Sequence, residues 1–285
     1  MVANRKAFSN ILMPNVHHLR HTHLKENLFV KGEPETGAYL ADDLERIAAN
    51  IGGENIAACI VEPIAGSTGS LVPPKGYLKR LREICDKHGI LLIFDEVITG
   101  WGRTGESFAA QSFDVTPDII TMAKGITNGV MPLGAVASRE SIYDTLLDAS
   151  PTGAIEFFHG YTYSAIPPCI AAGLAMQEII KKENLFERSK NMSPYFLDGL
   201  FSLKDIDIIT DIRGYGMLGG IDIKFDERLG KAGFSCFKKL FEVGLSLKAT
   251  GDCLIVAPPF ICEEHHIDEI IEKLRAGITN YMKSV

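Results

Sequence analysis

Short apolar runs alternate with a helical segment in the first half of the chain. Three runs rich in β-branched residues, IAACIV, ILLIF and IITMA, begin at Ile56, Ile90 and Ile119. Between the first two runs, residues 76–88 carry apolar side chains at three- and four-residue spacing, which predicts an amphipathic helix. Runs that are apolar on both faces are typical of a parallel sheet that is covered on both sides. Residues 47–136 therefore predict an α/β sandwich.

The pattern changes after about residue 165, where longer helical segments and alternating strands take over. The order is helix, strands, helix, strand, helix, in residues 171–203, 206–225, 231–244, 253–259 and 267–282. This order predicts a smaller α+β unit. We therefore expect two domains, a large one in residues 1–170 and a small C-terminal one in residues 171–285.

Composition and charge are those of an ordinary globular protein, with 46% hydrophobic and 23% charged residues among 285. The net charge of −7, without a segment dense in Lys and Arg, argues against binding to nucleic acid or to an anionic membrane. The apolar runs are far shorter than the roughly 20 residues that cross a bilayer. The N-terminus lacks the apolar region of a secretory signal, and the six cysteines form no CxxC pair, so we expect a reduced, cytoplasmic protein.

Each of the three apolar runs is followed by a charged residue, namely Glu62, Asp95 and Lys124. Because the carboxyl ends of parallel strands meet at one edge of a sheet, we expect these side chains to converge on a ligand crevice. Taken singly, Glu62 could be a hydrogen-bonded strand end, Asp95 a turn cap and Lys124 a solvated lysine. Their coincidence at equivalent positions of successive strands favours a functional site.

The chemistry of two of these residues indicates a particular cofactor. A lysine beside apolar walls is favoured in its neutral form, which suits it to attack a carbonyl and form a Schiff base. A carboxylate at a neighbouring strand end can hold a protonated pyridine nitrogen when the ring acts as an electron sink. Lys124 and Asp95 together therefore predict pyridoxal 5′-phosphate.

Two weaker motifs indicate other chemistry. Gly100, Gly102 and Gly105 match the GxGxxG of a dinucleotide-binding turn, which would indicate a nicotinamide-dependent oxidoreductase. The match is weak because residues 95–99 separate the strand end from the first glycine. Four histidines in residues 17–23 could suggest zinc, but their spacing fits no common site, and we expect a solvated or locally hydrogen-bonded cluster and no metal.

Residues 61–136, from VEPIAGS to PLGAV, resemble the core of a class-III pyridoxal-phosphate-dependent aminotransferase, most closely the ω-amino acid:pyruvate (β-alanine:pyruvate) branch. HGYTYSAIPP and DIRGYGMLGGIDI extend the similarity over nearly the whole chain. The resemblance implies the type-I fold of these enzymes, an α/β large domain with a mostly parallel sheet and a small α+β C-terminal domain. The family has a longer upstream segment with a phosphate-binding turn and a ring-stacking aromatic residue, so we expect an N-terminally truncated chain with a partial large domain.

The resemblance also implies roles for individual residues. Lys124 would form the Schiff base with the cofactor and move the substrate proton, and Asp95 would pair with the pyridine nitrogen. Val97 would pack against one face of the ring, and Glu62 would join the polar network at its edge. Thr162, in HGYTY, would reach the cofactor phosphate of a partner subunit, which implies a homodimer with shared active sites.

The stretch LKATGDCLIVAPP has Lys248 where this branch often carries an arginine for the substrate carboxylate. Lys248 is therefore a candidate for that contact, with a solvated lysine as the alternative. The implied reaction moves an amino group from an amine or ω-amino acid to an oxo acid such as pyruvate, with ping-pong kinetics. The competing interpretation is a truncated, catalytically impaired remnant that does not hold the cofactor.

Overall fold

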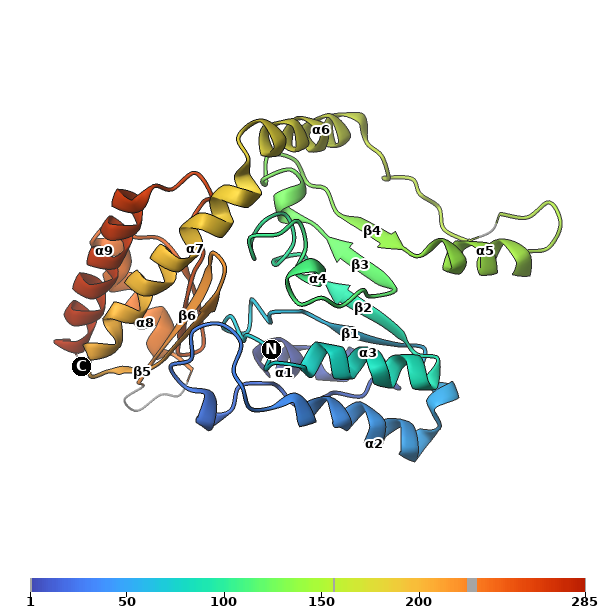
Figure 1. The fold of residues 1–285 in the computed structure, drawn as a ribbon, viewed down its shortest axis with the longest axis horizontal. Helices are drawn as coiled ribbons and strands as arrows, with labels where there is room; N and C mark the ends of the chain where they lie inside the picture. The colour runs from blue at the N-terminus through green and yellow to red at the C-terminus, as the bar shows by residue number, and fades with distance from the viewer. Residues whose placement is uncertain (1, 156, 225–229, 285) are drawn as a thin grey trace.

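The fold consists of two units, each built around a four-stranded sheet (Figure 1). The structure is a computed structural model that describes residues 2–155, 157–224 and 230–284. No helix within these ranges is long and apolar enough to span a membrane.

The first sheet is mostly parallel. Its strands lie in the order β1 (Ala58–Val61), β2 (Leu91–Asp95), β3 (Ile119–Met122) and β4 (Ala135–Ser138). β1, β2 and β3 are parallel, and β4 pairs antiparallel with β3. The three predicted strands are confirmed. The edge strand β4 was not predicted, because its four residues, AVAS, include only one β-branched side chain and so give a weak strand pattern.

Helices α2 (Asp42–Ile51) and α3 (Tyr77–His88) pack on this sheet. α3 confirms the predicted amphipathic helix, and its fully buried Leu81 belongs to the same core as Phe94 of β2. The helix ends at Gly89, whose φ of 68° lies in the left-handed region that favours glycine at a helix C-terminus.

The prediction that the first sheet is covered on both faces is wrong for the described residues. On the face opposite Cys59 and Phe94, Ala58 is exposed and Ile60 is 62% exposed, while Ile93 is only half-buried. Apolar strand residues indicate that a face is suited to burial. They do not indicate which segment of chain covers it.

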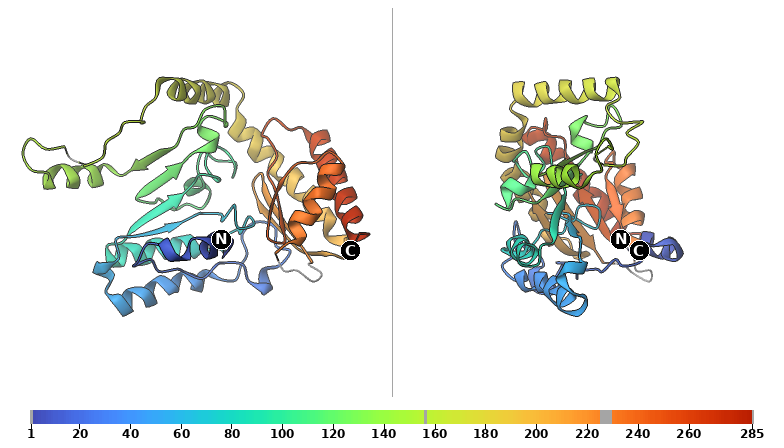
Figure 2. Two further views of the ribbon diagram at one scale, coloured as in Figure 1. Left: turned by 180° about the vertical axis from the view of Figure 1, so that it is seen from behind. Right: turned by 90° about the vertical axis from the view of Figure 1, so that its right-hand side faces the viewer.

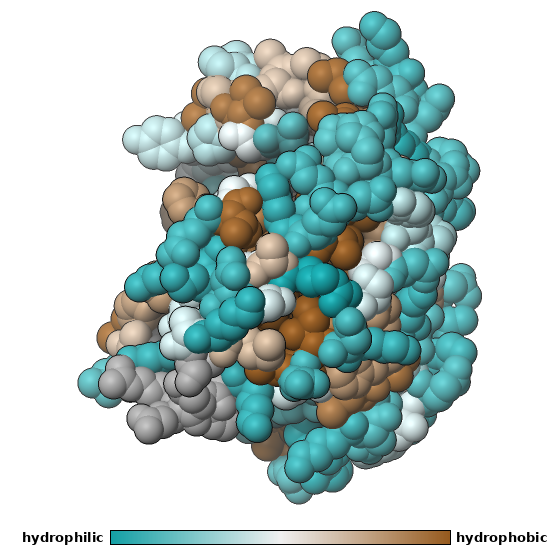
Figure 3. Space-filling model, turned by 90° about the vertical axis from the view of Figure 1, so that its left-hand side faces the viewer, coloured by the Kyte–Doolittle hydropathy of each residue, from teal (hydrophilic) through white to brown (hydrophobic). Residues whose placement is uncertain are grey.

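The second sheet is antiparallel throughout and forms the small unit. Its strands lie in the order β5 (Ile209–Tyr215), β6 (Leu218–Ile223), β8 (Cys253–Val256) and β7 (Lys248–Thr250). Three helices bury their apolar faces against it, namely α7 (Leu185–Phe201), α8 (Ala232–Glu242) and α9 (Glu264–Met282). From the side of this unit, the molecular surface is mostly hydrophilic (Figure 3). The predicted α+β unit is confirmed.

The single long helix expected over residues 171–203 is instead two helices. α6 (Pro167–Lys182) ends two residues before α7 begins, and Asn184 between them has a φ of 50°. Asparagine adopts this left-handed conformation more readily than most residues, so it can end one helix and redirect the chain. The domain boundary after residue 170 stays a prediction, because α6 runs across it.

Helix α5 (Glu140–Ala149) and the chain that leads from it to α6 extend away from both sheets (Figures 1 and 2). Several apolar side chains in this arm are exposed, including Phe158 at 96% and Tyr163 at 88%. We refer to residues 140–166 as the arm.

Arg213 of β5 connects the two units through a buried network. Its guanidinium pairs with Asp211 at 2.5 Å and with Asp222 at 2.8 Å. Its Nε donates to the carbonyl of Gly69, in the loop after β1, at 2.8 Å. Phe29 adds its backbone N–H to Asp211 at 2.6 Å, so the N-terminal segment joins the same network.

Replacing Arg213 by Met is expected to lower the free energy of unfolding by about 3–5 kcal/mol, because it leaves the buried Asp211 carboxylate without its cation. Urea unfolding monitored by circular dichroism measures the change. Arg275→Met is the matched control. Its ion pair with Asp205 is exposed, so it should cost about 1 kcal/mol or less. Equal losses in the two variants would contradict the structural role of Arg213.

Candidate active site

Glu62 directly follows β1, and its carboxylate is held by the loop that comes next. The backbone N–H of Gly66 donates to Glu62 Oε2 at 2.9 Å. Burial raises the pKa of Glu62, and the nearby negative charge of Asp95 adds to this effect. The Gly66 hydrogen bond and the charge of Lys124 oppose it.

Asp95 is the last residue of β2, and its carboxylate is fixed against the neighbouring strand. Its Oδ1 accepts hydrogen bonds from the Val97 N–H at 3.1 Å and from the Thr121 hydroxyl at 3.3 Å. In the parallel register of β1 and β2, Val61 pairs with Phe94. The next residues, Glu62 and Asp95, therefore lie at the ends of neighbouring strands and on the same face of the sheet.

Lys124 follows β3 and begins a short 3₁₀ turn, Lys124–Ile126, with a φ of 48°. This left-handed conformation is strained for a residue with a side chain, and such strain is concentrated at functional sites. Partial burial lowers the pKa of Lys124, and the positive charge of Lys248 lowers it further. Glu62 and Asp95 act in the opposite direction. Within the described chain, neither carboxylate forms a direct ion pair with Lys124.

A cavity of about 740 Å³ lies at this edge of the sheet, between the two units. Lys124, Val97 and Lys248 all line it. Lys248 lies on strand β7, and its Nζ donates to the hydroxyl of Ser67 at 3.1 Å. The structure thus places Lys248 in the lining of the cavity. Asp95 and Glu62 do not line the cavity, but their negative charges raise the pKa of Lys124.

Thr162 is the one predicted site residue that does not join this group. It lies in the exposed arm, where its hydroxyl donates to the carbonyl of Gly160 at 3.5 Å. The role predicted for Thr162 requires a second copy of the chain, so it stays a prediction.

Glu96, next to Asp95, has a structural function. The sequence alone does not distinguish this function from that of Asp95. The side chain of Glu96 is fully buried and accepts hydrogen bonds from Ala109 N at 2.6 Å, Ala110 N at 2.9 Å and the Thr99 hydroxyl at 3.0 Å. Burial raises the pKa of Glu96, while these donors lower it. Side chains alternate along a strand, which is the signal that places Asp95 and Glu96 on opposite faces.

The glycines of the GxGxxG match serve packing between the two units. A Cβ on Gly102 would lie 2.7 Å from Phe186, and one on Gly105 would lie 3.1 Å from the Cα of Lys190, both on α7. Helix α4 begins only at Ala109, so no helix N-terminus opens at the third glycine. The geometry of a dinucleotide-binding turn is not present here.

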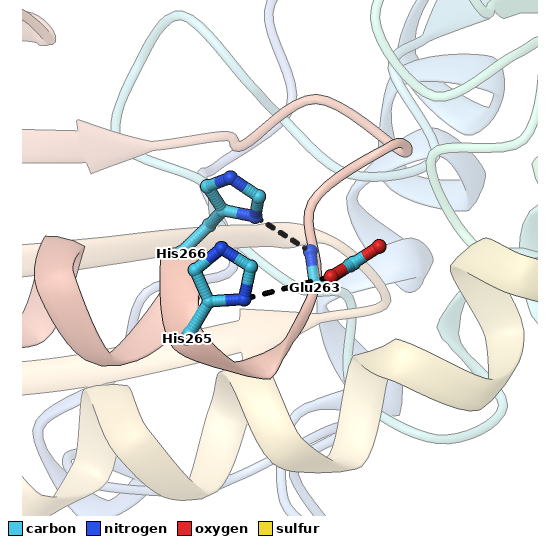
Figure 4. Close-up of side chains that lie close together, drawn as sticks. All are labelled: Glu263, His265 and His266. Carbon is cyan, nitrogen blue, oxygen red and sulfur yellow. Dashed lines mark hydrogen bonds and ion pairs between the residues drawn. The ribbon is translucent and has the colours of Figure 1, made fainter.

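His23, from the N-terminal histidine cluster, and the pair His265 and His266 have local contacts. His23 lies 3.6 Å from Asp211, whose carboxylate already pairs with Arg213. At the start of α9, Glu263 donates its backbone N–H to His266 Nδ1 at 3.1 Å, and His265 lies 3.5 Å from the Glu263 carboxylate (Figure 4). These contacts cap the helix.

This geometry agrees with comparison to known proteins. Residues 2–278 match the family Aminotransferase class-III. The chain belongs to the class-III aminotransferases. These enzymes depend on pyridoxal phosphate, so the predicted family and cofactor are confirmed.

Relatives of this class-III aminotransferase include the omega-aminotransferase of Caulobacter vibrioides, 51% identical over 95% of this chain and 62% of the relative. The omega-amino acid–pyruvate aminotransferase of Pseudomonas putida is 45% identical over 94% of this chain and 60% of the relative. The omega transaminase from Pseudomonas jessenii, solved in complex with PMP, superposes with a TM-score of 0.92 at 30% identity, covering 64% of that chain. The type-I fold is therefore confirmed, and the chain spans about three fifths of these relatives.

The residues at the strand ends fit the ring of pyridoxal phosphate. Lys124 offers an amine whose pKa is lowered, and Asp95 offers a carboxylate on the neighbouring strand. The absence of a direct ion pair between these two described residues leaves their charges available to a ligand. Val97 gives the cavity an apolar contact beside them.

The electrostatic arrangement around Lys124 predicts two opposite changes in its pKa. Lys248→Met should raise the pKa of Lys124 because it removes a positive charge, whereas Glu62→Gln should lower it because it removes a negative one. Only the neutral amine reacts, so the pH at half-maximal acetylation of Lys124 reports this pKa. Peptide mass spectrometry across a pH series measures it. A shift of the same sign in both variants would contradict the arrangement.

Proposed function

We propose that this site carries out pyridoxal-phosphate-dependent transamination, moving an amino group from an amine or ω-amino acid to an oxo acid such as pyruvate. The observation that carries the proposal is Lys124, an amine with a lowered pKa in a cavity beside Asp95 and Glu62. The Pseudomonas putida relative is named an omega-amino acid–pyruvate aminotransferase, which supports this substrate class. This chain spans 60% of that relative.

Four residues of this chain would hold the cofactor. Lys124 Nζ would bind it covalently, Asp95 would pair with its ring nitrogen, and Val97 would contact one face of the ring. Glu62 would contribute to the polar contacts at the ring edge. When bound, pyridoxal phosphate supplies an electron sink that stabilises negative charge on the substrate carbon.

The protein itself supplies proton transfer and positioning. With its pKa lowered, Lys124 Nζ can take up a proton from the substrate and return it. Asp95 is held by Val97 and Thr121, so its carboxylate keeps one orientation during turnover. Lys248 is placed to attract a substrate carboxylate. The release of one product before the second substrate binds gives ping-pong kinetics.

Covalent attachment of the cofactor tests the proposal. The protein is incubated with pyridoxal phosphate, reduced with borohydride and digested, and the peptides are weighed by mass spectrometry. We expect the label on Lys124, and no label at this site in Lys124→Ala. Lys204→Ala, which removes an exposed lysine outside the site, should label like the wild type. Absence of label in the wild type would favour the impaired remnant.

We also propose that the protein is a homodimer in which the arm contacts a second copy. Large exposed apolar areas on a soluble protein mark interaction surfaces, and the arm exposes Phe158 and Tyr163 almost completely. A two-fold dimer would bury both arms at once. Thr162 lies between these side chains in the sequence, so the same contact could bring it to the partner's cofactor phosphate.

The six cysteines are all buried and unpaired, which supports a location in the reducing cytoplasm.

The double variant Phe158→Asp/Tyr163→Asp should be monomeric, because two charges replace the apolar contacts proposed at the interface. Light scattering coupled to size exclusion measures the mass, with 31.2 kDa expected for the monomer. Phe241→Asp replaces an exposed aromatic residue on α8, outside the arm, and should leave a dimer intact. A wild-type protein that is already monomeric would refute the proposed dimer.

A further inference from the structure

Arg103 lines the cavity and has no role in the chemistry proposed above. It lies in the loop between β2 and α4. Its Nη1 donates to the carbonyls of Met217 and Pro258, each at 2.8 Å. The guanidinium carbon lies 4.5 Å from the centre of the Phe260 ring, so the group is also stacked.

The charge of Arg103 has no counter-ion among the described residues. Within the part of the chain that the structure describes, no carboxylate forms an ion pair with it. Burial lowers the pKa of Arg103 to about 10, which still leaves it protonated at neutral pH. A partly buried cation without a counter-ion is unfavourable, so the site is suited to an anion.

Among the described residues, the hydrogen bonds of Arg103 leave one edge of its guanidinium without a partner. The group carries five N–H donors, and the two bonds to Met217 and Pro258 involve Nη1 alone. Nε and Nη2 form the edge that can donate two parallel hydrogen bonds to a carboxylate. Lys248, by contrast, offers a point charge that already donates to Ser67.

The lining of the cavity around Arg103 is also suited to an anion with an apolar part. Arg103, Lys124 and Lys248 line it, and its described lining contains no Asp or Glu. Its remaining wall near Arg103 is largely apolar, with Leu245, Leu247, Phe260, Ile261 and Ile270. Such a space favours a ligand that combines a carboxylate with an apolar chain.

We propose that Arg103 is the residue that binds the carboxylate of the substrate, with the apolar part of that substrate against the small-unit wall. This assignment rests on the proposed transamination. It specifies the substrate class as carboxylates with an apolar chain. Lys248 would then attract the carboxylate into the cavity without binding it, and would set the charge around Lys124.

Ligand binding can be measured without cofactor or turnover. Trp101 is the only tryptophan in the chain and lines the same cavity, so its fluorescence reports occupancy. The probes are hexanoate and hexanamide, which have the same length but differ in charge. We expect hexanoate to bind at least about tenfold more tightly than hexanamide. Equal affinities for the two probes would overturn the proposal.

Three variants identify the cation responsible. Arg103→Lys should weaken hexanoate binding by about tenfold or more, since it removes the fork of donors. Lys248→Met and Lys124→Ala should each retain the preference for hexanoate. Loss of the preference in Lys248→Met, or its full retention in a folded Arg103→Lys protein, would overturn the assignment.

Arg103 also contacts the small unit, so circular dichroism must show that Arg103→Lys is folded. If that variant does not fold, the double variant Lys124→Ala/Lys248→Met still decides the question, because it leaves Arg103 as the only cation among the described lining residues and should keep the preference for hexanoate. Hexanoate binding that persists in Lys124→Ala, together with absence of cofactor labelling in the wild type, would separate carboxylate binding from transamination.

Discussion

The parallel register of β1, β2 and β3 is the constraint on which the site depends. Because the three strands run in one direction, Glu62, Asp95 and Lys124 follow their carboxyl ends at the same edge of the sheet. A shift of one residue in β2 would turn Asp95 towards α3 and place Glu96 on the opposite face. The buried contacts of Glu96 with the N-terminus of α4 oppose such a shift.

The site also requires the small unit to stay in place, and two arginines contribute to this. Arg213 holds the loop after β1 by its bond to Gly69, and Arg103 holds the loop after β2 to Met217 and Pro258. Gly102 allows Phe186 of α7 to approach closely. The loops that carry the chemistry are thus fixed from both sides, so the cavity is part of the domain interface.

Much of this arrangement could be predicted from the sequence. The strand runs and the α3 periodicity are local patterns, and the charged residues after the runs are read directly from the chain. The open face around Ile60 could not be predicted, because covering a face depends on segments distant in the sequence. Two further features depend on tertiary contacts, namely the left-handed conformation of Lys124 and the lack of a counter-ion for Arg103 in the described part of the chain. Neither feature produces a periodic pattern in the sequence. The GxGxxG pattern alone does not indicate what its glycines do, whereas the structure shows that Gly102 serves packing.

The charges in the cavity link substrate binding to proton transfer. Lys248 lowers the pKa of Lys124, which keeps a larger fraction of the free amine neutral and able to attack a carbonyl. A carboxylate bound at Arg103 would add negative charge to the same cavity and would raise the pKa of Lys124. The amine would then become a stronger base when the proton must be removed from the substrate. One set of cations can therefore favour a nucleophilic lysine in the free protein and a basic lysine in the complex.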